Sequence, residues 1–284
     1  MPSLKALRKR IATVRSTQQI TKAMKMVAAA KLRRAQENAE RARPYTSKLT
    51  EMFAAVVGEL GAEAHPLLAR RPEHRADLLL ITGDRGLCGG YNANLLRLAQ
   101  AFVAQRSGTQ VALAVVGRKG IEYYRRRNVA LLAERQQVAT RPPLDVARDL
   151  ARVLMARFTA AETDAVYVLY SRFRSAISQI PTVAPLLPVA PPAEEVRGPE
   201  YIFEPPRQAF LAALLPRYVE AILMQALLES IASEHGARMT AMDSATNNAA
   251  DMIDRLTLSM NRARQATITT ELMEIVSGAE ALKG

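Results

Sequence analysis

The stretch MDSATNNAADMIDRLTLSMNRARQAT, residues 242–267, points most directly to the architecture of the chain. Apolar or small side chains recur in it at spacings of three and four, as in a helix that packs along a partner helix. The predicted seam consists of Met242, Ala245, Ala249, Met252, Leu256, Met260, Ala263 and Thr267. The pattern predicts one long helix over about 207–277. Pro216 lies near its start, and Gly236 inside it costs about 1 kcal/mol relative to alanine.

The N-terminal end carries a matching helical pattern. Between Ser3 and Val57 there is no glycine, and the only proline is Pro44. Ser3 is a suitable N-cap, and Pro44 removes a backbone donor, so we expect a capped helix that kinks at the proline. Its seam should follow one face at heptad spacing, through Leu4, Leu7, Ile11, Val14, Gln18, Thr21, Lys25, Ala28, Leu32 and Ala35.

Two polar residues, Gln18 and Lys25, interrupt this N-terminal seam. We expect the flanking Ile20, Met24 and Val27 to supply the apolar contacts there. Because each terminal helix presents a long seam, the simplest joint solution is an antiparallel coiled coil, in which each seam buries the other.

The middle of the chain alternates strand and helix patterns. Apolar runs over 77–82, 111–116 and 165–170, and a shorter one over 129–132, alternate with helical stretches, which indicates a mainly parallel sheet covered by helices. We therefore expect an α/β fold with a long antiparallel coiled coil and a central Rossmann-like domain. The expected boundaries are 1–57 and 207–284 for the shaft helices, 75–190 for the α/β domain, and 191–206 for a linker or foot. Residues 181–206 hold eight of the 15 prolines, so this stretch should be a linker or an extended edge segment.

The charge of the chain is concentrated at one end. The net charge is +12, and residues 1–50 carry 13 Lys or Arg against Glu37 and Glu40. Such a basic block favours an acidic partner, whether nucleic acid, an anionic membrane face or an acidic protein surface. A basic coiled-coil nucleic-acid-binding protein is therefore one alternative, although no aromatic residue precedes Tyr45 to stack on bases. An acid-poor, Arg-rich N-terminus is also a feature of transit peptides, but the helical pattern continues past any cleavage point, so we expect an intracellular protein.

The sequence offers little material for catalysis or metal binding. A glycine-rich turn at 83–90 follows a strand, as phosphate-binding turns do, so a nucleotide-dependent enzyme is a second alternative. The turn lacks the Gly-x-Gly-x-x-Gly and Gly-Lys-Ser/Thr spacings, however, and we expect a tight packing turn. Cys88 is the only cysteine, so an internal disulfide is excluded. No run approaches the roughly 18 apolar residues of a membrane span.

Four segments are distinctive: ITKAMKMVAAAK at 20–31, DRGLCGG at 84–90, SQIPT at 178–182 and NRARQATITTELMEIVSG at 261–278. Together and in this order they resemble the gamma subunits of F-type ATP synthases. The resemblance implies a central rotor stalk, whose paired terminal helices stand inside a hexamer of alternating alpha and beta subunits. The foot would rest on the membrane rotor ring of c subunits beside the epsilon subunit. Rotation would couple proton flow to ATP synthesis and hydrolysis.

The resemblance also implies where partners touch. Arg264, Gln265, Thr269 and Glu271 match a polar contact with an acidic loop of the beta subunit, and Lys22 and Met24 match the helix region that faces the same loop. Tyr201, Phe203 and Glu204 match the contact with the rotor ring, although the family often has a second tyrosine where this chain has Phe203.

Further expectations follow from the same resemblance. It implies catalytic sites on beta, with no catalytic, cofactor, metal or nucleic-acid site on this chain. The single cysteine excludes a paired-cysteine redox switch like that of chloroplast members. The implied location is the cytoplasmic face of a bacterial inner (plasma) membrane, reached through partners, in preference to a mitochondrial or plastid origin.

Overall fold

The computed structural model describes residues 3–60, 65–136, 141–190 and 206–281, with side chains omitted for 58–60, 280 and 281. Contacts divide the chain into two units. One unit combines residues 1–27 with 239–284, and the other contains residues 28–238. The two long terminal helices each contribute to both units.

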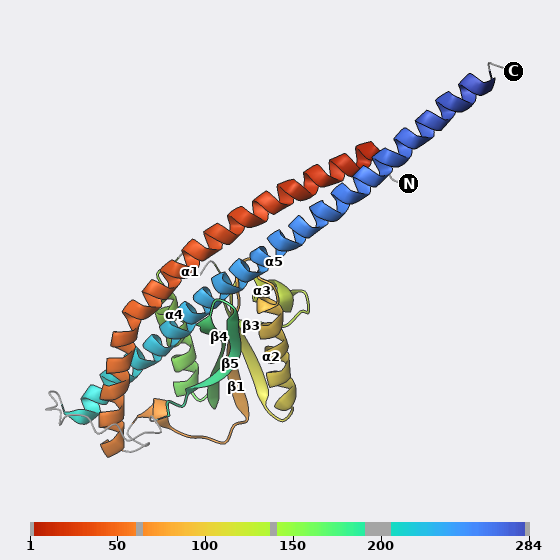
Figure 1. Ribbon diagram of the computed structural model, residues 1–284. Helices are drawn as coiled ribbons and strands as arrows, with labels where there is room; N and C mark the ends of the chain where they lie inside the picture. Colours follow the sequence, from red (N-terminus) through yellow and green to blue (C-terminus); the bar gives the residue numbers. More distant parts are fainter. Residues whose placement is uncertain (1–2, 61–64, 137–140, 191–205, 282–284) are drawn as a thin grey trace. The chain divides into compact units, whose positions relative to one another are not determined.

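The N-terminal helix, α1, extends over Leu4–Leu60 and passes through Pro44 without a break. Its start is capped as predicted, because the Ala6 amide donates to Ser3 Oγ at 3.3 Å. Pro44 is exposed, and so is Glu40, the residue whose carbonyl loses its helical partner. Figure 1 shows α1 bending in its orange C-terminal part, in line with the predicted effect of the proline.

The C-terminal helix, α5, extends over Arg207–Ala281 and contains Pro216. It includes an 18-residue window with a mean hydropathy of 1.5, which by length and composition alone would suffice to cross a membrane. However, 61% of that window is buried inside the protein. We interpret it as a core helix.

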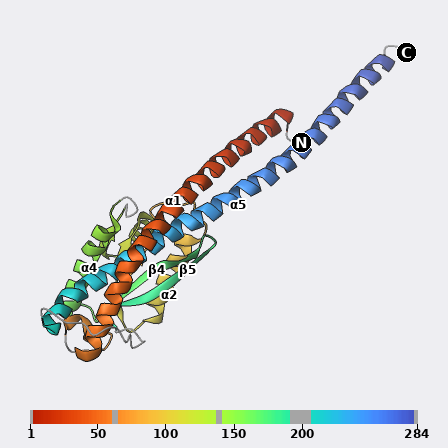
Figure 2. The same cartoon turned by 60° about the vertical axis from the view of Figure 1, so that its left-hand side comes forward.

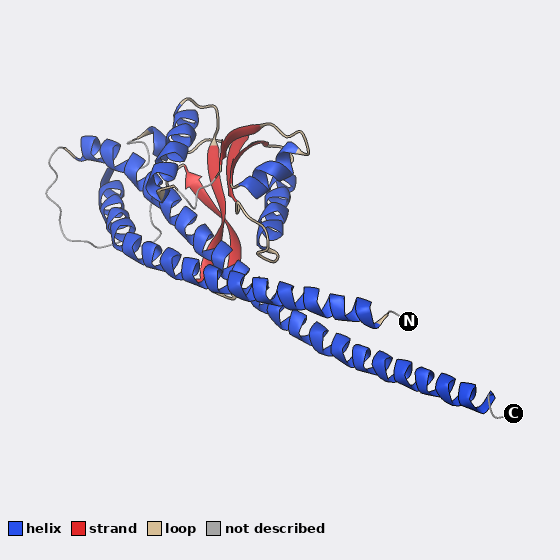
Figure 3. Cartoon of the chain, turned by 90° about the horizontal axis from the view of Figure 1, so that it is seen from above, coloured by secondary structure: helices blue, strands red, loops and turns tan. Residues whose placement is uncertain are grey.

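The larger unit contains the predicted sheet, with strand order β3-β2-β1-β4-β5. Strands β3, β2, β1 and β4 run parallel to one another, and β5 runs antiparallel to β4. Figure 3 shows the strands in red with helices on both sides. The strands are β1 (Arg75–Ile81), β2 (Gln110–Val116), β3 (Leu131–Arg135), β4 (Ala165–Ser175) and β5 (Ser178–Leu187). The helices between them are η1 (Pro66–Leu68), α2 (Tyr91–Gln105), α3 (Arg118–Arg125) and α4 (Pro143–Thr159). The Rossmann-like α/β prediction is confirmed.

Two hydrophobic cores lie on the two faces of this sheet. One contains α2 and α3, and the other contains α4 together with residues 49–57 of α1 and 211–227 of α5. Phe53 of α1 stacks on Tyr218 of α5, with ring centroids 4.6 Å apart. The long helices therefore form one layer of the α/β core itself, which the heptad pattern did not reveal.

The proline-rich segment begins as an edge strand. Of the predicted linker or edge segment 181–206, residues 181–187 belong to β5. Pro181 and Pro185 both lie on β5, the strand at the end of the sheet, which is where a proline is tolerated because an edge strand has a neighbour on one side alone. The short strand predicted at 129–132 begins two residues later, at Leu131.

Gly236 of α5 has a packing reason. A Cβ atom built there would lie 3.3 Å from the Ala176 carbonyl oxygen and 3.4 Å from Ala176 Cα. Ala176 lies in the turn between β4 and β5. The glycine therefore lets the helix approach the backbone of this turn closely.

Candidate functional site

The smaller unit pairs the start of α1 with the second half of α5, and Figures 1 and 2 both show the red and blue helices side by side. The predicted α1 seam is confirmed there, because Leu7, Ile11 and Thr21 are buried. Of the flanking residues, Met24 is half-buried as expected, whereas the expectation is wrong for Ile20 and Val27, which are 57% and 56% exposed.

Polar residues remain in this seam because they have partners on α5. Lys25 Nζ lies 2.6 Å from Asp243 Oδ1, and the Thr246 hydroxyl lies 2.8 Å from Thr21 Oγ1. Both members of the ion pair are nearly half exposed, so the pair adds little stability. These contacts define an antiparallel register that places Leu4 opposite Ala263.

The α5 seam differs from the prediction at two points. Met252 is 45% exposed, and Ile253 is half-buried in its place, so the seam from Ala249 to Ala263 keeps a regular alternation of spacings of four and three. The predicted seam also extends to Thr267, whereas Ala263 is the last of the described side chains on α5 that is not exposed.

Beyond Ala263, α5 continues as a single exposed helix. Every side chain described from 264 to 279 is exposed, including Ile268, Leu272 and Ile275. Four predicted contact residues lie on this part, which we call the α5 tip: Arg264, Gln265, Thr269 and Glu271. The Thr269 hydroxyl donates to the Gln265 carbonyl at 2.9 Å, a bond within the helix that leaves both side chains at the surface.

The other two contact residues predicted for the same partner loop lie elsewhere along the pair. Lys22 is exposed and Met24 is half-buried, next to the Thr21–Thr246 contact. That level is 18 residues from Arg264, or about 27 Å along the helix axis. The structure therefore does not bring the two groups together. Tyr201, Phe203 and Glu204 lie outside the described residues.

The basic character of the N-terminal helix is a surface property. Arg8, Arg15 and Lys22, which recur every seven residues along α1, are exposed, as are Lys5 and Lys9. In the smaller unit these charges lie on the side of α1 away from the seam. The N-terminal helix thus offers a positive face to a partner.

The glycine-rich turn in the larger unit is filled by the protein itself. Three amides at this turn and at the neighbouring Gly117–Gly120 turn have partners within the protein: Gly83 N donates to Asn92 Oδ1 at 2.9 Å, Arg118 N to Asp84 Oδ1 at 3.0 Å, and Gly120 N to Thr82 Oγ1 at 3.0 Å. A Cβ at Gly83 would lie 2.9 Å from the Glu234 carboxylate of α5. These contacts support the expected packing turn.

A buried polar cluster, which the sequence reasoning missed, fastens α5 to this turn. Arg238 donates to Glu234 Oε1 at 2.6 Å and to the carbonyls of Arg85 and Gly86 at 3.3 Å. His235 Nδ1 lies 3.2 Å from Arg238 Nη1. The signal available in the sequence was the Glu-x-x-x-Arg spacing with an adjacent histidine in an otherwise apolar helical stretch.

Burial shapes the ionisation of this cluster. Burial, and then the charges of Arg238, Lys31 and Arg85, lower the pKa of His235 to about 4. Burial raises the pKa of Glu234, and the Arg238 guanidinium opposes that shift. At neutral pH a neutral His235 ring can therefore accept a hydrogen bond from Arg238.

The shifted pKa of His235 predicts acid sensitivity. Because the folded pKa is lower than the unfolded value near 6.5, the unfolded chain binds the proton more readily, and stability falls as the pH drops from 6.5 toward 4. We expect wild type to lose about 2 to 3 kcal/mol more unfolding free energy between pH 7 and 4.5 than His235→Gln. The raised pKa of Glu234 acts in the opposite direction but is present in both proteins. Urea unfolding at the two pH values measures the difference, and equal losses would contradict the assignment.

The remaining candidates for chemistry are the thiol of Cys88 and possible clusters of metal ligands. Burial raises the pKa of the Cys88 thiol, so the protonated, non-nucleophilic form is favoured. In the part of the chain that the structure describes, no group of three or more His, Cys, Asp or Glu side chains is placed to hold a metal ion.

The architecture and these surfaces agree with the comparisons to known proteins. The family profile described as ATP synthase matches residues 3–282. The ATP synthase gamma chain of Moorella thermoacetica is 51% identical over 283 residues, and that of Solibacter usitatus is 52% identical over 285, with 99% or more of each chain covered. The chain belongs to the ATP synthase gamma-chain family.

Solved structures agree with this assignment. A chain of the Tetrahymena thermophila mitochondrial ATP synthase central stalk and c-ring matches with a TM-score of 0.61 and 26% identity, over 80% of this chain and 99% of that one. A chain of the Euglena gracilis enzyme matches with a TM-score of 0.67, over 98% of this chain and 94% of that one; at 18% identity it supports the fold alone. As a gamma chain, the protein is a non-catalytic rotor-stalk subunit of a membrane-associated ATP synthase. The nucleic-acid-binding alternative has no support in these comparisons.

Proposed function

We propose that this gamma chain turns inside a hexamer of alternating alpha and beta subunits, rests on the c ring beside epsilon, and couples proton flow to ATP synthesis and hydrolysis on the beta subunits. In this proposal the complex lies on the cytoplasmic face of a bacterial inner membrane, and the chain reaches the membrane only through its partners. Its own residues transmit torque and catalyse no step.

The observation that carries the proposal is the unpaired α5 tip. Ile268, Leu272 and Ile275 recur at i, i+4 and i+7, and they are 48%, 57% and 69% exposed. A helix of about 16 residues with an exposed apolar stripe gains most of its stability from packing against a partner. A surrounding collar of subunits would cover this stripe while still letting the helix turn.

Charged groups supply the proposed contact with the hexamer. Arg264 and Gln265 follow directly after the last half-buried seam residue, so both project from the tip. An arginine can make a charge-assisted, bidentate bond to a carboxylate. Lys22 lies about 27 Å further along the pair, so we infer that it and Arg264 contact acidic surfaces at two different levels of the hexamer.

Replacing Arg264 tests the proposed contact between the α5 tip and the hexamer. In the assembled complex, Arg264→Ala should lower the ATPase rate about tenfold, because a hydrogen bond between charged groups contributes about 1.5–3 kcal/mol. Arg262→Ala is the matched control, since Arg262 is an exposed arginine two residues earlier, on a different side of the same helix. Unchanged ATPase rate and assembly yield for Arg264→Ala, or an equal loss for Arg262→Ala, would contradict the contact.

Purification from native membranes tests the assembly as a whole. The tagged chain should recover alpha, beta, epsilon and c subunits together with ATPase activity. Recovery of the chain alone would overturn the proposed partners. Recovery with nucleic acid, released steeply by salt, would favour the alternative function.

A further inference from the structure

The hairpin of β4 and β5 extends beyond the rest of the sheet. Strand β1 pairs with β4 only from Ala165 to Leu169, whereas β4 continues to Ser175 and pairs there with β5 alone. Residues 170–182 therefore form a two-stranded ribbon, which we call the hairpin ribbon; Figure 2 shows the two strands running together. An isolated two-stranded ribbon is marginally stable in water, so this one needs support from elsewhere.

Helix α5 and local hydrogen bonds provide that support. The buried Ser233 hydroxyl donates to the Ser171 carbonyl at 2.9 Å. Gln179 Nε2 donates to the Ala176 carbonyl at 2.7 Å, and Gly236 allows the same turn to approach the helix closely. The backbone at the end of the ribbon is thus held in place from two sides.

The residue presented at this held turn is unusual for its position. Ile177 is 82% exposed, although hairpin turns ordinarily favour glycine, asparagine, aspartate or serine. The preceding turn residue, Ala176, packs closely on Gly236, which explains a small apolar side chain at that position. Packing within the described residues does not account for Ile177. Ile180, on the returning strand, is also 42% exposed.

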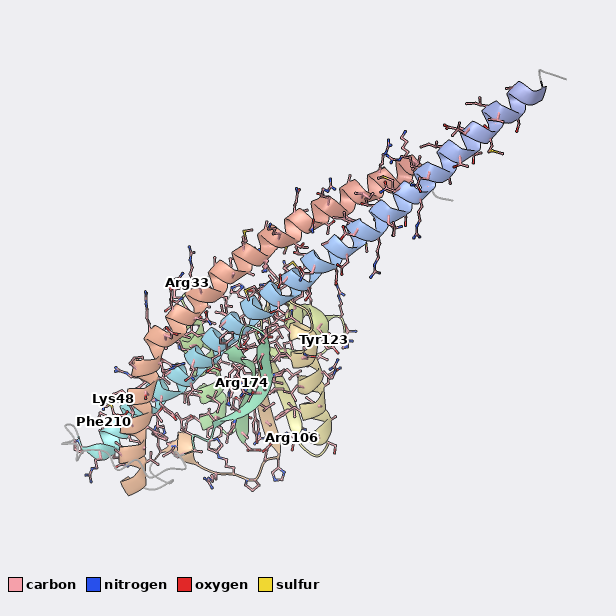
Figure 4. All side chains as sticks on the ribbon, in the orientation of Figure 1. Arg33, Lys48, Arg106, Tyr123, Arg174 and Phe210 are labelled. Atoms are coloured by element: carbon pink, nitrogen blue, oxygen red, sulfur yellow. The ribbon has the colours of Figure 1, made fainter. Side chains whose placement is uncertain are left out.

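The ribbon is also positively charged. Residues 170–182 contain Arg172 and Arg174 and no aspartate or glutamate, and both arginines are exposed. Arg172 bonds to Tyr170 and interacts with Glu229. Arg174, labelled in Figure 4, has no hydrogen bond or ion pair with any residue in the described ranges.

We propose that the end of the hairpin ribbon, formed by Arg172, Arg174 and Ile177, docks an acidic segment of another subunit, with Ile177 entering an apolar contact at its centre. The positive charge of the two arginines and the exposed side chain of Ile177 define the chemistry of this partner. The inference rests on the proposed function, because the partner is sought among the subunits of the ATP synthase complex. A lipid surface fits less well, because about 1 kcal/mol per arginine and one isoleucine side chain give only weak membrane binding.

A photo-crosslinker identifies the partner directly. Benzoylphenylalanine replaces Ile177 in the assembled complex, and Val129, a 39% exposed residue before β3, is the matched control position. We expect a single major adduct from position 177 with an acidic segment of another subunit, and none from position 129 with that segment. An adduct with lipid, with a non-acidic segment or with this chain itself would overturn the proposal, as would no adduct.

Charge reversal then tests the arginine. Arg174→Glu should lower the yield of that adduct about tenfold, since placing like charges together costs more than an ordinary contact contributes. Arg97→Glu, an exposed arginine on α2, should leave it unchanged. A lysine at the contacted acidic residue should restore the yield with Arg174→Glu; no loss, or no restoration, contradicts the proposal. Complexes that retain alpha and beta subunits with ATPase activity but give no adduct refute the docking site alone, whereas absence of those subunits refutes the proposed function.

Discussion

Replacing Arg238 with methionine is expected to destabilise the larger unit by about 3 to 5 kcal/mol, since removing one partner of a buried pair leaves the other charge uncompensated. Glu234 would be left buried, and the carbonyls of Arg85 and Gly86 would each lose their donor. Urea unfolding at pH 7 measures the loss. Because burial already raises the pKa of Glu234, protonation of this carboxyl group at mildly acidic pH should make the variant's loss relative to wild type smaller there than at pH 8.

The matched control removes both charges together. Glu234→Leu with Arg238→Met should recover a large part of the lost stability, because a well-packed apolar pair no longer leaves a buried charge unpaired. If the double variant is as unstable as Arg238→Met alone, the loss arises from the carbonyls of the turn and not from the uncompensated carboxylate. A loss below about 1 kcal/mol in Arg238→Met would show that the cluster contributes no more than an exposed ion pair.

Replacing Gly117 with alanine should cost about 4 kcal/mol or more, for two reasons that act together. The residue has a φ of +93°, which side chains with a Cβ atom rarely adopt. A Cβ there would lie 2.1 Å from the Thr82 carbonyl oxygen, a backbone atom that β1 and β2 hold in place. The strand and turn must therefore move apart, and the thermal midpoint of unfolding reports the loss.

Gly86→Ala is the control for this glycine. It lies in the neighbouring glycine-rich turn, but a Cβ there would meet no atom within 4 Å. Its midpoint should stay within about 2 °C of wild type. Comparable losses for both variants would mean that neither the clash with Thr82 nor the positive φ of Gly117 sets the cost.

The sequence predicted the elements better than their joint packing. Heptad spacing identified both long helices, and Leu7, Ile11 and Ala249 are buried as expected. It failed where polar residues found partners across the pair. Lys25 stays in the seam because it forms an ion pair with Asp243 of α5. Ile20, which we expected to supply apolar contacts near the polar seam residues, is exposed. A pattern read along one helix cannot contain the residue that the other helix supplies.

The candidate sites divide in the same way. Family motifs pointed to Arg264 and Gln265, and the structure adds that these residues lie on a helix without a partner, far from Lys22. The Glu234–Arg238 cluster was missed because its partners are carbonyl groups of a turn about 150 residues away, and every residue type has a carbonyl.

Composition and local periodicity were sufficient to establish the two long helices, the central α/β sheet and the positive N-terminal face, because each depends on spacing within a short window of chain. The family followed from motifs that occur in a fixed order. Only the tertiary structure showed that segments of α1 and α5 form one layer of the α/β core. It also showed that Gly236 lets the turn between β4 and β5 approach α5 closely, and that α5 continues as an exposed helix beyond Ala263. These features depend on contacts between residues that are far apart in the sequence, and such contacts are determined by how the helices and strands pack in three dimensions.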